Sequence, residues 1–426
     1  MANKSAGPGL NQKLDLTIEK LVPGGDGMSH AEGKVIFVPG TLPGEKVRVR
    51  CTESKKDYAR GDVVEILEAS PDRVKPPCPV FGRCGGCDWQ HAGYEAQLRL
   101  KVAMVEDALR RTGGLAFPGL AIESGKPLRY RNRIQTHRDS SGRAGFLARN
   151  SHAVVPVDTC PISHPAFDAL LAGPRPRGGV RGGGPDPDAI PTFREDRQGP
   201  GRRYAAWAHT PRGGAGDYLV GEGPDGTTRL GAASKRLPAE PIGEISVEVL
   251  GKTVRFDLRC FFQSNLEMLE KLIPYALEGL GGREAMDLYG GVGLFGAFLA
   301  DHFETVVSVE ENPIALEYAL RNIGEAHRFL RGRLEDLVGE VRGHLADSRP
   351  EAIVVDPPRD GLDATVKDFL VAKMPARLIY VSCNPVTLAR DLKILLARGF
   401  RLDDLRLFDF YPQTAHVEAV AKLSPV

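Results

Sequence analysis

Apolar and polar residues alternate in short stretches through the first seventy residues of the chain. A period of two is typical of half-buried strands, and the glycines and prolines between the stretches are typical of turns. Closely spaced short strands of this kind favour a small β-barrel of the oligonucleotide-binding type, which we place at residues 10–70. The alternating or apolar stretches are Leu14 to Ile18, Val35 to Val38, Val47 to Cys51 and Val63 to Leu67.

From Arg259 onward, short apolar stretches alternate with longer stretches of helical periodicity. This order indicates an α/β fold, and we predict a doubly wound, Rossmann-like domain over residues 259–426. Residues 71–258 are predicted to form a β-rich central domain, with an amphipathic helix over residues 94–111. Within it, the Gly/Pro-rich segment from Gly173 to Pro191 is interpreted as a surface insertion without an assigned role.

Three polar motifs follow predicted strands of the C-terminal domain. Asp287 to Gly293 is rich in glycine, Asp356 to Arg359 contains two prolines, and Cys383 follows the apolar stretch Leu378 to Val381. Open α/β sheets bind their ligands beyond the carboxyl ends of the strands, where such motifs meet. A cysteine at a strand end is usually a packing residue, but its neighbours here favour a thiol beside a nucleotide-like cofactor.

The glycine-rich loop leaves two cofactors open. Gly291 to Gly296 matches the dinucleotide pattern, which suggests NAD. Asp287 before the first glycine fits S-adenosylmethionine better, because its carboxylate can face the amino group of a cationic ligand. Glu310, at the end of the next predicted strand, suits the ribose hydroxyls of either cofactor.

A thiol at this place suits methylation of uracil at C5. That carbon becomes nucleophilic when a thiolate adds at C6, and a base must then remove the C5 proton before the thiolate can leave. The uracil must also leave its stack to reach the thiol. Cys383 is the candidate nucleophile and Glu418 the candidate base, although the local pattern around Glu418 is also that of a surface carboxylate.

The charge distribution points to RNA. The net charge is only +1, so a nucleic-acid surface must be local. Basic residues crowd Lys126 to Arg149, against the single acid Asp139, and Tyr130 and Phe146 lie among them. Arginines interleaved with aromatic residues favour a surface that contacts phosphates and stacks on bases.

Membrane and secretion signals are not found in the sequence. No stretch approaches about eighteen consecutive apolar residues, and Met1 to Gly9 contains no hydrophobic signal core. The seven cysteines are too few and too unevenly spaced for a secreted disulfide scaffold. We therefore expect a cytoplasmic protein without a membrane segment. The sequence is silent on oligomeric state, and a monomer is the default expectation.

Four of the cysteines suggest a metal site. Cys78, Cys84 and Cys87 are close in sequence and Cys160 follows far downstream. Four thiolates can hold either a structural zinc ion or an iron–sulfur cluster. Zinc ribbons usually have two close pairs of cysteines, which differs from the spacing here.

Taken together, these motifs resemble the RNA 5-methyluridine methyltransferase family, in particular its 23S ribosomal RNA uracil-C5 branch. The resemblance covers nearly the whole chain. Residues 12–70 resemble an N-terminal TRAM domain, and Phe261 to Asn265 resembles the family's cofactor-entry motif. The other matching motifs, in the family's order, are Asp287 to Gly293, Asp356 to Arg359, Ser382 to Thr387 and His416 to Glu418.

The resemblance implies a role for each candidate residue. Cys383 would be the nucleophile and Glu418 the proton acceptor, and the four cysteines would hold a [4Fe–4S] cluster. Relatives often have cysteine in place of Gly290, and some have asparagine in place of Leu294. The residues implied to contact S-adenosylmethionine are Gln263, Tyr289, Glu310 and Asp356, and those implied to bind the cluster are Cys78, Cys84, Cys87 and Cys160.

Four other functions stay open at this point, one of which is a non-catalytic chaperone of ribosomal RNA. Within the family, a tRNA uracil-C5 methyltransferase is the nearest alternative to the 23S rRNA enzyme. A cytosine-C5 methyltransferase usually has its nucleophile after proline or threonine, whereas Cys383 follows Ser382. From a different class, the chain could be an RNA-binding redox protein that uses NAD.

Overall fold

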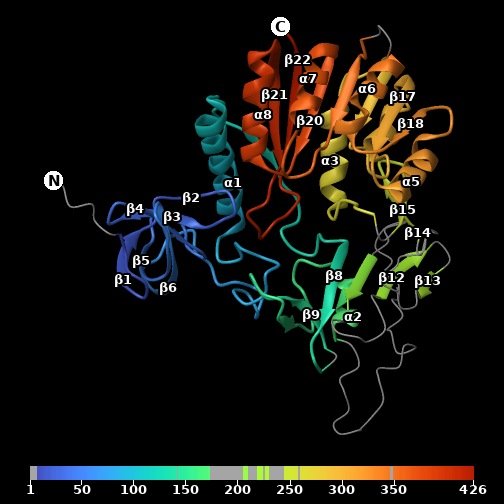
Figure 1. Cartoon of the computed structure of the whole chain (residues 1–426). Helices are drawn as coiled ribbons and strands as arrows, with labels where there is room; N and C mark the ends of the chain where they lie inside the picture. The colour runs from blue at the N-terminus through green and yellow to red at the C-terminus, as the bar shows by residue number, and fades with distance from the viewer. Residues whose placement is uncertain are drawn as a thin grey trace.

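The computed structural model describes residues 7–141, 143–172, 205–209, 218–223, 226–229, 244–257, 260–345 and 349–426. The Gly/Pro-rich insertion predicted from Gly173 to Pro191 lies outside these residues. Figure 1 shows the N-terminal sheet beside helix α1, and the central strands on the other side of the molecule from the C-terminal end.

The N-terminal sheet encloses a small core of its own. The alternating residues predicted to face inward are buried there, among them Leu16, Val47 and Val49. The described part of the sheet has the strand order β1-β5-β6-β4-β3-β2. Its strands are β1 (Lys13–Thr17), β2 (Lys20–Leu21), β3 (Gly27–Ala31), β4 (Lys34–Val38), β5 (Lys46–Ser54) and β6 (Tyr58–Glu68).

The central part consists of short strands in the order β10-β9-β8-β11-β12-β13 and of a separate hairpin, β14-β15. The hairpin packs against the core of the C-terminal sheet through Val247 and Val254. The described elements are β8 (Arg133–Arg138), β9 (Ala144–Leu147), β10 (Val154–Pro156), η2 (Pro165–Phe167), α2 (Asp168–Ala172), β11 (Ala205–His209), β12 (Tyr218–Gly223), β13 (Gly226–Arg229), β14 (Glu244–Val249) and β15 (Lys252–Asp257).

The C-terminal sheet has the order β18-β17-β16-β19-β20-β22-β21-β7 in the described chain. Its strands from β18 to β20 are parallel, and β22 pairs antiparallel with both β20 and β21. The strands are β16 (Gly282–Leu288), β17 (Phe303–Glu310), β18 (Arg328–Arg331), β19 (Ala352–Val355), β20 (Arg377–Ser382), β21 (Phe400–Phe408) and β22 (Glu418–Pro425).

The helices of this part connect its strands and cover the sheet (Figure 1). Two of them begin with an asparagine cap followed by proline, a residue favoured in the first helical turn: Asn312 before α5 and Asn384 before α8. The helices are α3 (Leu266–Leu277), α4 (Leu294–Leu299), α5 (Pro313–Ile323), α6 (Leu334–Leu345), α7 (Ala364–Lys373) and α8 (Pro385–Ala397).

One segment of the predicted central domain packs onto the C-terminal sheet. Strand β7 (Ala121–Glu123) pairs in parallel with β21 and so forms the edge of that sheet. The predicted helix over residues 94–111 forms as α1 (Tyr94–Ala108), which continues into a π-helical turn, η1 (Leu109–Gly113), beside α8. The boundaries at residues 70 and 258 stay predictions.

A buried ion pair joins α1 to the segment before β22. The Nζ atom of Lys101 lies 2.5 Å from Oδ1 of Asp409, and both side chains are fully buried. Lys101 also donates to the carbonyl of Tyr411, and the Tyr94 hydroxyl donates to the other carboxylate oxygen of Asp409. These bonds compensate for the removal of both charges from water.

We expect Asp409→Ala to lower the free energy of unfolding by about 3–5 kcal/mol, because it leaves the Lys101 ammonium buried without its carboxylate. The matched control is Glu123→Gln, which breaks the partly exposed pair between Glu123 and Arg406 on the same edge of the sheet. That change should cost less than about 1 kcal/mol. Urea unfolding of both variants measures the difference, and equal losses would contradict this account.

Candidate active site

Asp356, Cys383 and Glu418 lie at one edge of three neighbouring strands. Asp356 follows β19 and Cys383 follows β20, and these two strands are parallel. Glu418 is the first residue of β22, which runs the opposite way, and Ser382 pairs with Ala419. The antiparallel return of β22 therefore places its first residue beside the residue that follows β20.

The loop around Cys383 is held by hydrogen bonds to the Asp-Pro-Pro-Arg loop. The Asn384 side chain accepts from Val386 N at the start of α8 and donates to the carbonyl of Arg359. The Thr387 hydroxyl donates to the same carbonyl, over 3.1 Å. The half-buried thiol between these groups is thus fixed relative to Arg359.

Burial and two nearby carboxyls raise the pKa of the Cys383 thiol. Loss of water contact contributes most, followed by the negative charges of Glu418 and Asp356, and together they raise the pKa of Cys383 to about 11. The positive charge of Arg359 acts in the other direction. Cys383 is therefore a protonated thiol at neutral pH in the free protein.

Glu418 is only 4% exposed. Burial is the main cause that raises the pKa of this carboxyl well above its usual range, and the nearby charge of Asp356 adds to it. Asp356 itself has a pKa raised to about 7 by burial and by Asp287. Asp356 and Glu418 line the same cavity as Arg359, so the protonation of this site is sensitive to what binds in it.

A cavity of about 580 Å³ extends from these residues to the glycine-rich loop. Tyr289 and Glu310 line it, as do Gln263, Asp356, Cys383 and Glu418. The Glu310 carboxylate is oriented by the amides of Gly291 and Asn312, at 2.9 and 2.7 Å. The Gln263 Oε1 atom is buried without a hydrogen-bond partner, so the cavity offers a bound molecule an unsatisfied acceptor.

Asp287 has a different place from the one expected. Its carboxylate does not line the described cavity but accepts a hydrogen bond from Gly296 N at 2.8 Å, beneath the loop. It is 1% exposed, and burial raises its pKa to about 7. We conclude that Asp287 shapes the turn into α4 and that Glu310 and Asp356 are the carboxylates facing the cavity.

Three further residues line the cavity although the sequence patterns did not assign them a role: Arg359, Tyr411 and His416. The rings of Tyr411 and His416 meet edge to face, with centroids 6.0 Å apart. Burial and nearby positive charges lower the pKa of His416 to about 4, so its imidazole is neutral at pH 7. Its position two residues before Glu418 was the available signal.

Comparisons with known proteins identify the family of the chain. Residues 242–425 match the model of the family described as tRNA (uracil-5-)-methyltransferase, and residues 10–64 match the TRAM domain. An uncharacterized RNA methyltransferase of Gloeobacter violaceus is 35% identical over 97% of this chain and 96% of its own length. Another from Halalkalibacterium halodurans is 33% identical over 99% of both chains.

The chain belongs to the tRNA (uracil-5-)-methyltransferase family. It is thus an S-adenosylmethionine-dependent RNA methyltransferase, as the sequence motifs predicted, and the NAD-linked redox alternative is not retained. Among solved structures, the tRNA (uracil-54, C5)-methyltransferase of Pyrococcus abyssi, in complex with S-adenosyl-L-homocysteine, has a TM-score of 0.65. It is 24% identical, and the match covers 96% of this chain and 99% of that one, which confirms the predicted fold.

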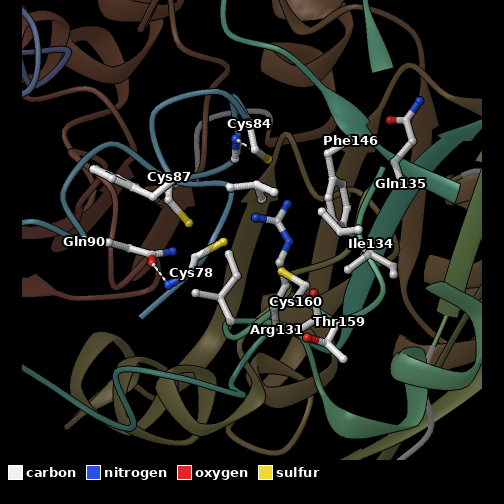
Figure 2. A pocket seen from close by; sticks show the side chains of 16 residues that line it. Cys78, Cys84, Cys87, Gln90, Arg131, Ile134, Gln135, Phe146, Thr159 and Cys160 are labelled. Carbon is white, nitrogen blue, oxygen red and sulfur yellow. Dashed lines mark hydrogen bonds between the residues drawn. The ribbon is translucent and has the colours of Figure 1, made fainter. Parts of the chain in front are cut away.

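The four clustered cysteines of the methyltransferase line one cavity of about 140 Å³. In Figure 2 the sulfur atoms of Cys78, Cys87 and Cys160 point toward the middle of the view, where Arg131 also extends. Within the described residues, no three His, Cys, Asp or Glu side chains are close enough together to hold a metal ion. All seven cysteines are free thiols.

The basic segment of the methyltransferase is only partly available to RNA, because several of its arginines are bonded within the protein. Arg129 pairs with Asp168, Arg143 with Asp139 and Arg149 with Asp88. Arg133 donates to the carbonyl of Cys260.

No helix in the described part of the chain is long and apolar enough to cross a membrane.

We expect alkylation of Cys383 by iodoacetamide to accelerate about tenfold per pH unit from pH 7 to 10, because only the thiolate reacts and its pKa is about 11. Arg359→Gln should slow the reaction at each pH, since the arginine lowers the pKa of the thiol. Peptide-resolved mass spectrometry measures both rates. A plateau below pH 9, or faster alkylation in the variant, would contradict this prediction.

Proposed function

We propose that the enzyme methylates C5 of a specific uridine in 23S ribosomal RNA, through a covalent bond between Cys383 and C6 of the uracil. The observation that carries this proposal is the meeting of Cys383 and Glu418 in the cavity that Tyr289 and Glu310 also line. A nucleophile, a base and a nucleotide-binding loop share one space there, as uracil-C5 chemistry requires.

Each residue then has a defined part in the reaction. Cys383 loses its proton to solvent and its sulfur bonds to C6, which makes C5 nucleophilic. S-adenosylmethionine supplies the methyl group that C5 takes. Glu418 then removes the C5 proton, and the bond between sulfur and C6 breaks to restore the uracil ring and release Cys383.

The cofactor is held by residues at the other end of the cavity. Glu310 accepts from the ribose hydroxyls, since its carboxylate already faces the cavity in a fixed orientation. Tyr289 has a left-handed φ of 62°, which turns it out of the glycine-rich loop, and its hydroxyl donates to Glu335. Gln263, whose carbonyl oxygen lacks a partner, and Asp356 bind the polar groups of the methionine part.

The Cys383 thiol and the Glu418 carboxyl have to be deprotonated before each can take its part in the reaction. With its pKa raised to about 11, the Cys383 thiol is protonated in the free enzyme at neutral pH, and burial also raises the pKa of Glu418 well above its usual range. The basic forms of both are needed in turn, so turnover should rise with pH through the neutral range. Arg359 lowers the pKa of both groups and is the residue that favours the reactive forms.

The four-cysteine cavity supports a [4Fe–4S] cluster on Cys78, Cys84, Cys87 and Cys160. The thiols surround a space of about 140 Å³ instead of converging on one point, which suits a cluster of several atoms better than a single zinc ion. Arg131 lines the same space, and its positive charge favours an anionic group there. The cluster would join residues 78–87 to Cys160, which lies far downstream in the sequence.

The four-cysteine cavity and the TRAM domain favour ribosomal RNA as the substrate. The motifs resemble the 23S branch of the family, which has both the cluster and the TRAM domain. The tRNA alternative is retained because the solved relative of Pyrococcus abyssi, which aligns over nearly the whole chain, acts on tRNA. A cytoplasmic monomer is the state we propose, since such RNAs and free thiols share that compartment.

The test is methyl transfer from labelled S-adenosylmethionine to unmodified 23S rRNA and to unmodified tRNA. We expect 5-methyluridine in 23S rRNA only, none with Cys383→Ala, and turnover lowered roughly 10²- to 10⁴-fold with Glu418→Gln. Product in tRNA alone would change the substrate and keep the chemistry. Product with Cys383→Ala at the wild-type rate would overturn the mechanism.

A further inference from the structure

We propose that Gln97 is a positioning residue that connects the cysteine loop to the proton acceptor Glu418. The inference rests on the proposed function, because it concerns the step in which Glu418 removes the C5 proton. Two segments are involved, and both are defined by their residues. The cysteine loop is residues 78–92, and the acceptor loop is residues 409–417, which leads directly into Glu418 at the start of β22.

Gln97 is a fully buried polar residue on α1, and its side chain is bonded to both loops. Its Nε2 atom donates to the carbonyls of Trp89 and Ala92, at 3.1 and 2.9 Å, in the cysteine loop. The same atom lies 3.0 Å from Oε1 of Gln413, and its Oε1 accepts from Gln413 N at 2.9 Å. One amide group therefore holds two segments more than three hundred residues apart in sequence.

The two loops are also bonded to each other directly. The carbonyl of Gln413 accepts from the amides of Asp88 and Trp89, at 3.1 and 3.0 Å. Asp88 follows Cys87, one of the residues that line the cysteine cavity. The residue next to Cys87 is therefore a direct partner of the acceptor loop.

The acceptor loop needs this support because its backbone is strained. Gln413 has a φ of 69°, in the left-handed region that a residue with a side chain seldom adopts. Such a conformation costs of the order of 1–3 kcal/mol and persists where neighbouring groups hold it. Its other partner is the carbonyl of Pro127, which accepts from Gln413 Nε2 at 3.3 Å.

The nucleophile and the cofactor residues are held by different elements. Cys383 is fixed by α8 and by the bonds of Asn384 and Thr387 to Arg359, and Glu310 by the glycine-rich loop. Loss of the hydrogen bonds of Gln97 should therefore displace Glu418 and leave thiol addition and methyl transfer unchanged. The enzyme would then stall as a methylated covalent adduct, before the C5 proton is removed.

The experiment compares Gln97→Met with wild type and with Leu98→Met, a conservative change at the next residue of α1 that breaks no side-chain bond. We expect Gln97→Met to lower kcat roughly tenfold to a hundredfold, with the KM for RNA and for S-adenosylmethionine changed by less than about twofold. Covalent RNA–protein adduct should accumulate on unmodified RNA, as with Glu418→Gln, and Leu98→Met should behave as wild type.

Hydrogen exchange provides a readout that does not depend on activity. Residues 409–417 should lose protection in Gln97→Met, while α8 keeps its protection. If Gln97→Met does not fold, Gln97→Glu takes its place, because it keeps an acceptor for Gln413 N and loses the donor to Trp89 and Ala92.

Two results would overturn the proposal. One is wild-type turnover by Gln97→Met, or a parallel loss of adduct formation and of RNA affinity, which would indicate general unfolding. The other is unchanged protection of residues 409–417 in the folded Gln97 variant. If the wild-type enzyme itself forms no adduct on RNA containing 5-fluorouridine, the proposed function fails. The hydrogen-exchange measurement still tests whether Gln97 holds the acceptor loop.

Discussion

The antiparallel pairing of β22 with β20 is the constraint on which the rest of the active site depends. In a wholly parallel sheet the first residue of a strand lies at the edge away from the ligand crevice. Because β22 is reversed, its first residue, Glu418, comes to the crevice beside Cys383. The segment that precedes β22 must then cross that edge, and its position there has to be fixed by contacts from outside the sheet.

Those contacts come from the segment that leads from the N-terminal sheet into the central part. Lys101 pairs with Asp409, Gln97 with Gln413, and the cysteine loop with the carbonyl of Gln413. The burial of so many polar groups is costly unless each finds a partner. Their mutual bonds connect the cysteine cavity, α1 and the active-site edge into one network.

The site itself concentrates carboxyls where water is scarce. Asp356 and Glu418 raise the pKa of Cys383, and burial raises the pKa of each of them. Arg359 opposes this effect from the adjoining loop, whose carbonyl is bonded to Asn384 and Thr387. This arrangement raises the pKa of the thiol, and in the proposed mechanism its activation depends on what occupies the cavity.

Much of this was predictable because local patterns carry it. Apolar stretches ending in Asp356 and Cys383 predicted strand ends at a crevice, and the resemblance added the role of Glu418. The burial of Glu418 depends on β22 being antiparallel, which no local pattern indicates. In the sequence Gln97 is an ordinary polar helix residue, and its role depends on the packing of α1 against the acceptor loop. Strand β7 is too short for its sequence to indicate that it pairs at the edge of a distant sheet.

The central claim is that Cys383 bonds to the uracil ring, and covalent trapping tests it most directly. The protein would be incubated with S-adenosylmethionine and a 23S rRNA fragment containing 5-fluorouridine, beside Cys383→Ala. Fluorine at C5 cannot leave as a proton does, so the account predicts a methylated, denaturant-stable RNA–protein complex with the wild-type protein only. A complex of equal yield with Cys383→Ala, or none with 23S rRNA or tRNA although the cofactor is bound, would contradict it.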